Sequence, residues 1–308
     1  MAYRYGAEAL AAASAFEVDT LWVAGGLYGN GFALARLLEM FDGEAGSKQL
    51  VFNGDFHWFD ADPEAFDAIN RAVLAHAATR GNVETELADP GAGAGCGCGY
   101  PEWVGDADVA RSNRIIERLR SAARPQPAAL RALGRLPMFR VAALAGERVA
   151  IVHGDADSLA GWGFSQERLA TPEGRSAARL ALARACARVV ASSHTCLPVL
   201  QSLGTAGAIV NNGAAGMPNF EGTRFGVATR VSVRPRRGAL HAARVGRLHV
   251  EAHAIHYDHA AWVERFLGLW PPGSDAHASY YSRIAQGPRY ARAHALRSDH
   301  PEAPQQAA

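Results

Sequence analysis

The sequence predicts an α/β protein, because short apolar runs alternate with longer segments of helical periodicity. The strand-like runs cover residues 20–24, 49–52, 148–152, 189–191 and 208–210. Helix-like stretches separate them at residues 31–41, 63–79 and 172–187. After residue 222 apolar and polar residues alternate, which is typical of antiparallel strands. A chain of 308 residues with 49% hydrophobic content can bury a full core.

The start of the second helix has a clear local cause. Asp62-Pro63-Glu64 resembles an N-cap residue followed by proline at the first helical position, and apolar residues follow at helical spacing. A further helix is expected at residues 109–123, between a glycine-rich stretch and Pro125-Gln126-Pro127. We interpret residues 91–140 as a cap or insertion over the functional site. The chain would then form a single domain of residues 1–300, and residues 301–308 would be a disordered tail.

Composition and charge narrow the function classes. The formal net charge of +1 indicates neither nucleic acid nor an anionic membrane as a partner. Neither an 18-residue uncharged apolar run nor the apolar core of a signal peptide occurs, so we expect a cytoplasmic protein. Four cysteines are too few for a disulfide scaffold, and reduced thiols are expected. The oligomeric state is not predictable from these features.

Four loops carry side chains able to bind a metal ion, each next to a glycine or another small residue where a strand could end. Asp55 and Asn82 each follow a glycine, and His153 and His194 lie in turns after later strands. Many α/β proteins place their sites where such loops meet at one edge of a sheet, so these side chains could form a cluster. One carboxylate, one amide and two imidazoles suit a divalent transition metal such as Mn, Fe or Zn.

Further donors lie two residues from three of these positions, a spacing that places side chains on the same side of an extended segment. They are His57, Glu84 and Cys196. Cys96 and Cys98 add two sulfurs on a glycine-rich loop. These two cysteines are either incidental to a flexible loop or part of a metal or redox site.

The order of these motifs resembles that of the calcineurin-like metallophosphoesterase family over about residues 20–220. Gly25-Gly26-Leu27-Tyr28-Gly29-Asn30 stands where the family has Asp-x-His-Gly-Asn. The segment 210–218 is similar to a turn in the family's small bacterial branch. The resemblance implies a four-layer α/β/β/α sandwich of metallophosphoesterase type. It also implies a metal-dependent phosphoesterase that hydrolyses a small phosphomonoester or phosphodiester through a metal-bound hydroxide.

The resemblance also implies roles for individual residues. The family binds two metals, and Asp55 would bridge them while Asn82, His153 and His194 complete one of the two sites. The remaining ligands of the other metal would stand at Gly26, Tyr28 and Cys196, where the family's Asp and His residues are missing. One metal site is therefore lost or rebuilt, and one or two ions are expected. Tyr28 is expected to fill the space of a lost ligand.

These departures leave several alternatives open. His57, Cys196, Cys96 and Cys98 are available to rebuild the metal site. His57 or Glu84 could instead be the general acid, because Val83 stands at the position of the family's usual histidine. The alternative to an enzyme is a pseudoenzyme, a ligand-binding or sensing module that has lost one metal site.

The expected partner is a small phosphorylated substrate. Aromatic residues near the motifs are expected to line its pocket and to favour an organic group, namely Trp58, Trp103, Trp162 and Phe164.

Overall fold

The computed structural model describes residues 3–89 and 95–299, whose strands form two sheets. The first sheet contains, in spatial order, β1 (Phe16–Glu17), β5 (Phe139–Leu144), β6 (Glu147–Val152), β7 (Val189–Ser192), β9 (Ala208–Asn211), β8 (Val199–Ser202) and β13 (Leu296–Ser298). The second contains β11 (His241–Val245), β12 (Leu248–Ile255), β10 (Gly226–Ser232), β2 (Thr20–Ala24), β3 (Lys48–Asn53) and β4 (Ala77–Thr79).

Both sheets mix parallel and antiparallel pairs. The strands β2, β3 and β4 are parallel, as are β6, β7 and β9. The late strands β10, β11 and β12 pair antiparallel, which confirms the prediction from their alternating sequence. The parallel strands end at the same edge of the molecule, and their following loops meet there.

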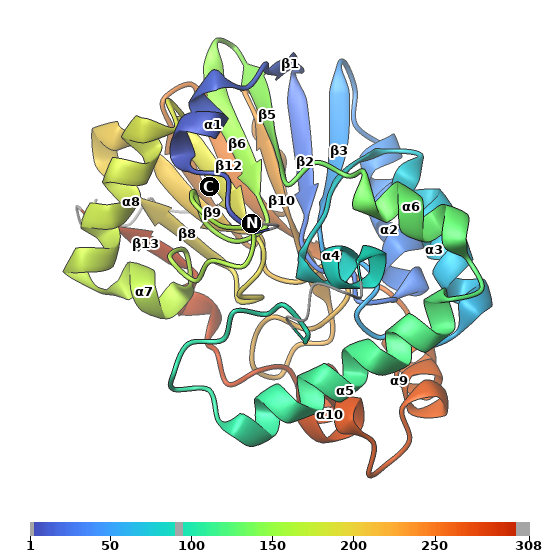
Figure 1. Ribbon diagram of the computed structural model, residues 1–308. Helices are drawn as coiled ribbons and strands as arrows, with labels where there is room; N and C mark the ends of the chain where they lie inside the picture. Colours follow the sequence, from blue (N-terminus) through green and yellow to red (C-terminus); the bar gives the residue numbers. More distant parts are fainter. Residues whose placement is uncertain (1–2, 90–94, 300–308) are drawn as a thin grey trace.

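Helices cover the outer faces of the two sheets (Figure 1). On the first sheet lie α1 (Ala7–Ala12), α7 (Gln166–Ala170) and α8 (Pro172–Arg184). On the second lie α2 (Gly31–Asp42), α3 (Pro63–Leu74) and α9 (His259–Leu269). The predicted four-layer α/β/β/α sandwich is therefore confirmed. The short 3₁₀ helices are η2 (Gly204–Ala206) and η3 (Arg292–His294).

Alternation along the strands sorts the side chains between the layers. Leu21, Val51 and Ile151 point into a core between the two sheets. Trp22 and Phe52, one residue further along their strands, point to the outer core under α2 and α3. Successive strand residues face opposite sides, and both sides are covered, so these strands appear in the sequence as continuous apolar runs.

The segment that begins at Pro63 starts as predicted and ends earlier than predicted. Asp62 is the N-cap of α3, and its carboxylate accepts from the Glu64 amide at 2.9 Å. The helix ends at Leu74, and Ala77–Thr79 forms the strand β4 instead of a continued helix. The prediction of helix through residue 79 is wrong because pairing with β3 overrides the local preference of an alanine-rich segment.

Three further helices lie in or directly before the predicted cap. These are α4 (Asn82–Ala88), which precedes it, and α5 (Asp106–Ala123) and α6 (Pro127–Gly134). Below the sheets in Figure 1, α5 packs against α10 (Asp275–Gln286), whereas α6 packs against α4. Residues 139 and 140, assigned to the cap from the sequence, belong to β5. The predicted tail at 301–308 lies outside the described residues.

A membrane-spanning helix must be both long and apolar. None of the described helices combines the length and the apolar composition that crossing a bilayer requires.

Candidate metal centre

Four polar side chains meet where the parallel strands end. Asp55 follows β3, His153 follows β6, His194 follows β7, and Asn82 begins α4 just after β4. The Nε2 atom of His153 lies 3.2 Å from Asp55 Oδ2, 3.3 Å from Asn82 Oδ1 and 3.2 Å from His194 Nδ1. All four residues are buried. The structure thus brings together the four side chains that the sequence singled out.

Hydrogen bonds orient both imidazoles toward the centre of the cluster. The carbonyl of Asn53 accepts from His153 Nδ1 at 2.8 Å, and the carbonyl of Cys98 accepts from His194 Nε2 at 2.8 Å. In the neutral rings, the tautomers that these bonds require leave the lone pairs of His153 Nε2 and His194 Nδ1 facing each other. Two facing lone pairs repel, and a cation between them removes the repulsion.

The oxygen donors complete a set that fits a divalent ion. Asn82 donates through Nδ2 to the Cys96 carbonyl at 2.9 Å, so its Oδ1 faces the cluster. Potential ligand atoms of Asp55, His153 and His194 all lie within 4.8 Å of one another. This is the only such group of three or more His, Cys, Asp or Glu side chains among the described residues. Two nitrogen and two oxygen donors suit Zn, Fe or Mn better than a purely oxygen-binding ion.

Backbone geometry holds the Asp55 carboxylate in place. Asp55 has a φ of 55°, in the left-handed region, which aspartate tolerates better than most residues. Its Oδ1 accepts from the Val83 amide at 3.1 Å. Gly81 lies so close that a Cβ there would overlap this carboxylate. The glycine is therefore required for the approach of Asp55 to the start of α4.

The charges of the cluster depend on one another. Burial lowers the pKa of His153, but the Asp55 carboxylate and the Asn53 carbonyl more than offset this, so the pKa of His153 is raised overall. Burial and the neighbouring His153 lower the pKa of His194 to about 4. Burial raises the pKa of Asp55, and the two histidines reverse this so that it lies below its usual value. Without a metal, His153 therefore holds a proton more readily than His194, which stays neutral near neutral pH.

We expect metal affinity to fall as the pH decreases, because a proton competes with the ion for each imidazole. The pKa of His153 lies above the ordinary histidine value of 6.5, whereas the pKa of His194 is about 4. In the pH range between these two pKa values, the metal affinity should weaken about tenfold for each unit that the pH falls. Below this range it should weaken more steeply, because protons then compete for both imidazoles. Titration with a competing chelator at several pH values measures this slope. A variant of the exposed His256, His256→Asn, should leave the slope unchanged, and a pH-independent affinity would contradict the assignment.

His57 lies away from the cluster, inside the outer core. Its side chain is fully buried, its Nδ1 is 2.9 Å from Asp60 Oδ2, and its ring stacks on Phe66 with 3.9 Å between centroids. It does not line the pocket beside the cluster. The prediction for His57 assumed an extended segment, in which residues 55 and 57 face the same side. The chain instead turns at Gly54 and Asp55, both of which have positive φ, so the two side chains point in different directions.

Glu84 also points away from the pocket and binds backbone amides. Its Oε2 accepts from the amides of Asp55 at 2.7 Å and Gly81 at 2.8 Å, and its Oε1 accepts from Phe56 at 3.0 Å. Burial and the nearby Asp55 raise the pKa of Glu84, and the amide donors act in the opposite direction. Both oxygens are used by the backbone, so the geometry supports a structural role for Glu84 and gives no support to general acid catalysis.

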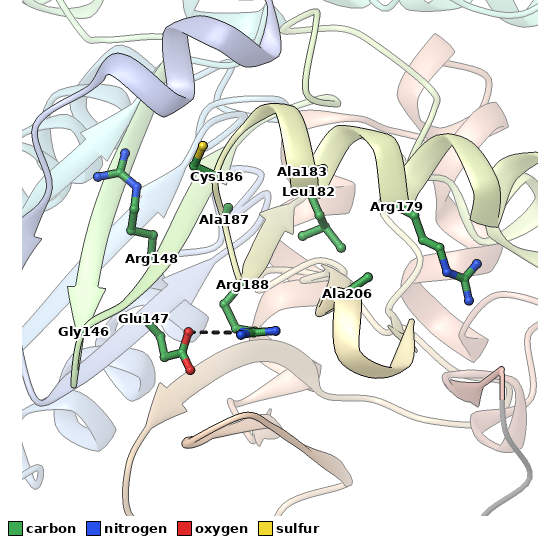
Figure 2. Close-up of a pocket in the computed structure, with 10 residues that line it drawn as sticks. All are labelled: Gly146, Glu147, Arg148, Arg179, Leu182, Ala183, Cys186, Ala187, Arg188 and Ala206. Atoms are coloured by element: carbon green, nitrogen blue, oxygen red, sulfur yellow. Dashed lines mark hydrogen bonds and ion pairs between the residues drawn. The ribbon is translucent and has the colours of Figure 1, made fainter.

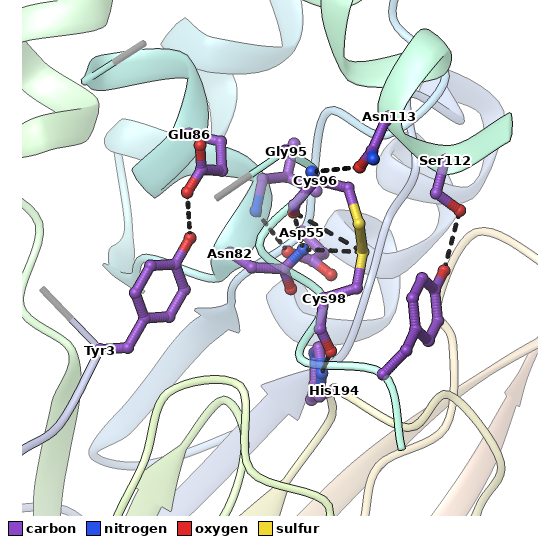
Figure 3. The surroundings of a disulfide bond; sticks show 12 residues. Tyr3, Asp55, Asn82, Glu86, Gly95, Cys96, Cys98, Ser112, Asn113 and His194 are labelled. Carbon is purple, nitrogen blue, oxygen red and sulfur yellow. Dashed lines mark hydrogen bonds between the residues drawn. A yellow bond between two sulfur atoms is a disulfide. The ribbon is translucent and has the colours of Figure 1, made fainter. Parts of the chain in front are cut away.

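The cysteines differ from the expectation of free thiols. Cys96 and Cys98 form a disulfide beside Asn82 (Figure 3). Reduced thiols were therefore the wrong expectation for this pair, and in this form neither sulfur is a thiolate ligand. The loop contributes its carbonyls instead, which fix Asn82 and His194. Cys196 is a free cysteine outside the cluster, and its Sγ lies 2.6 Å from the Tyr28 hydroxyl.

A pocket of about 180 Å³ opens beside the cluster. Asp55, Asn82 and His194 form one wall of it. Most of the remaining lining is aromatic, and it comprises Tyr28, Trp58, Tyr100, Trp162 and Tyr280, together with Cys98, Thr195, Cys196 and Arg283. The predicted pocket residues Trp58 and Trp162 are among them. Trp103 is instead 74% exposed, and Phe164 packs in the core under α8.

A second cavity, of about 340 Å³, lies at the opposite end of the strands (Figure 2). Its arginines already have partners. Arg188 pairs with Glu147 at 3.1 Å, and Arg148 donates to three backbone carbonyls after and within α1. Because Glu147 and Arg148 begin β6, this cavity faces away from the loops that carry the cluster. We assign no function to it.

Some residues that shape the site were not identified from the sequence. The buried Asn53 donates to the Val152 carbonyl at 2.6 Å and to Ser193 Oγ at 2.8 Å, which ties together the strands that precede Asp55, His153 and His194. A polar residue at the end of an apolar run was a usable signal for it. Tyr280 and Arg283 lie on α10, distant along the chain from every motif, and their sequence carries no such signal.

Two sheets packed between helical layers, with carboxylate, amide and imidazole donors at the ends of their strands, constitute the metallophosphoesterase fold. The structure is similar to the crystal structure of a metallophosphoesterase from Sphaerobacter thermophilus, with a TM-score of 0.51, 18% identity, and coverage of 87% of this chain and 100% of that one. It is also similar to a hypothetical protein from Pyrococcus horikoshii OT3, with a TM-score of 0.60, 15% identity, and coverage of 88% and 99%. At these identities the likeness establishes the fold alone. Comparison of the sequence with protein-family models and with curated proteins finds no match.

Proposed function

We propose that this protein is a metal-dependent phosphoesterase of the small bacterial branch, acting on a small phosphomonoester or phosphodiester. One observation carries the proposal: lone pairs from Asp55, Asn82, His153 and His194 converge at the strand ends of a metallophosphoesterase fold. We propose these four residues as ligands of a Mn, Fe or Zn ion. His57 and Glu84 are not part of the proposed chemistry, because neither reaches the pocket.

A bound divalent ion would polarise a phosphoryl oxygen and lower the pKa of a water molecule for in-line attack. The side chains around the ion would set the charge and the polarity of the site. Asp55 contributes a negative charge, and the two imidazoles stay neutral when an ion displaces the proton of His153. The aromatic walls limit the water around the reacting group, which strengthens electrostatic interactions there.

The proposal is tested by elemental analysis and a substrate screen. Protein purified without added metal is analysed for bound metals, and turnover of p-nitrophenyl phosphate and bis-p-nitrophenyl phosphate is then measured with Mn, Fe, Zn and Ni. A bound ion together with metal-dependent turnover supports the phosphoesterase. Protein that binds no ion and turns over neither ester with any of the four metals contradicts it.

A second candidate is a ligand-binding or sensing module on the same fold. The observation that favours it is the loss of ligands at Gly26, Tyr28 and Cys196, where a hydroxyl and a thiol contact each other at 2.6 Å. Binding of a phosphonate without turnover of any ester would identify this module. A small phosphorylated compound is the proposed partner in either case, and a cytoplasmic location stays a prediction.

A further inference from the structure

The pocket beside the metal cluster contains a cation that has no acidic partner in the described part of the chain. Arg283, on α10, lines this pocket and is half-buried. Its Nε donates to the Pro218 carbonyl at 3.2 Å and its Nη2 to the Cys196 carbonyl at 2.8 Å. No carboxylate of residues 3–89 or 95–299 forms an ion pair with it, and its Nη1 has no hydrogen bond to those residues. A guanidinium held by two carbonyls and not neutralised by an acid is suited to an anionic ligand.

The neighbouring wall does not offer a second metal site. The Tyr28 ring occupies the space over Gly26, where any Cβ would overlap it, and its hydroxyl meets Cys196 Sγ. The described residues contain one cluster of metal donors, Asp55, His153 and His194, and neither Tyr28 nor Cys196 belongs to it.

Phosphoryl transfer requires positive charge at more than one oxygen of the reacting group. One ion at the cluster supplies part of this charge. Arg283 is the remaining fixed positive charge among the pocket-lining residues. Arg283 is therefore positioned to bind the phosphoryl oxygens that do not contact the ion.

The rest of the pocket is aromatic and small. Trp58 and Tyr280 contact each other with 6.3 Å between ring centroids, and Tyr100 and Trp162 with 6.0 Å. The volume of about 180 Å³ is below the range of typical drug-sized sites. Such a space accommodates a phosphoryl group and one ring.

We propose that Arg283 binds the phosphoryl group in place of a second metal ion, and that the aromatic walls select a phosphomonoester with one small planar organic group. This inference rests on the proposed function, because it places the phosphoryl group beside the metal cluster. It adds the substrate class, a metal stoichiometry of one, and a positioning residue that the sequence motifs do not contain.

The test measures binding of phenylphosphonate, a non-hydrolysable analogue, to the metal-loaded protein by calorimetry. Arg283→Met should weaken binding roughly ten- to a hundredfold, the usual effect of a charge-assisted hydrogen bond, whereas Arg283→Lys should retain part of the affinity. The exposed Arg289 on the same segment provides a matched control, and Arg289→Met should bind as the parent protein does. Phenylphosphonate should bind at least about tenfold more tightly than methylphosphonate.

Metal content and thermal unfolding of each variant are measured alongside, so that loss of the fold is distinguished from loss of the anion contact. If Arg283→Met does not fold, Arg283→Lys and the two phosphonates still test the inference. Three results would each overturn the inference. The first is unchanged phenylphosphonate affinity in a folded Arg283 variant. The others are equal affinity for the two phosphonates and two metal equivalents in the parent protein. Arginine-dependent binding without turnover would leave the inference intact and refute the proposed phosphoesterase. Turnover that persists with unchanged binding in Arg283→Met would refute only the inference.

Discussion

Replacing Asp55 by Asn is expected to abolish metal binding at physiological concentrations and, with it, turnover. The substitution removes the only carboxylate among the four converging donors, so an ion at the site loses its charge compensation. Loss of outer hydrogen-bond partners of metal ligands typically costs ten- to a hundredfold in affinity, and we expect loss of this ligand to exceed about a hundredfold. Metal affinity is measured by chelator competition and turnover with p-nitrophenyl phosphate.

The fold should tolerate Asp55→Asn. Asparagine has the same shape, its Oδ1 can still accept from the Val83 amide, and it is among the residues that tolerate the left-handed conformation observed at position 55. The metal-free variant should therefore fold, with some loss of stability because the buried His153 loses its charged partner. Asp67→Asn, in an exposed pair with Arg71, is the matched control and should keep both metal and activity. Full metal occupancy in Asp55→Asn would refute the proposed centre.

Replacing Glu84 by Ala is expected to lower the free energy of unfolding by about 3 kcal/mol or more. The change leaves the amides of Gly81, Asp55 and Phe56 without their acceptor in a buried region, at about 1–3 kcal/mol each. This is a large part of the 5–15 kcal/mol that typically stabilises a domain. Urea unfolding of the metal-free protein measures the loss.

Glu84→Gln separates this structural role from acid catalysis. A glutamine carbonyl can accept from two of the three amides, so this variant should lose less stability than Glu84→Ala. If Glu84 supplied a proton to the leaving group, Glu84→Gln would remove one limb of the pH profile of turnover while the protein stayed stable. We expect the profile to keep its shape. The exposed Glu39 serves as the control, and Glu39→Gln should leave unfolding nearly unchanged.

The fold was predictable because its strands have two covered faces. Runs such as residues 21–24 and 149–152 are apolar throughout, which is the pattern of strands buried between layers. The strand Ala77–Thr79 was not predictable, because its three residues carry no pattern and pairing with β3 decides their conformation. Local periodicity identifies long elements, whereas a short edge strand depends on its neighbours.

The sequence alone predicted the layered fold and singled out four polar residues, although the strand before Asn82 was not predicted. Their types and their positions after glycine or at strand ends were sufficient to single out Asp55, Asn82, His153 and His194, because parallel strands bring such loops to one edge. The tertiary structure decided what surrounds them. It turns His57 into the core, binds Glu84 to backbone amides and joins Cys96 to Cys98. It also brings Arg283 to the pocket from the helix α10, and such an approach depends on packing between distant segments, which no local pattern encodes.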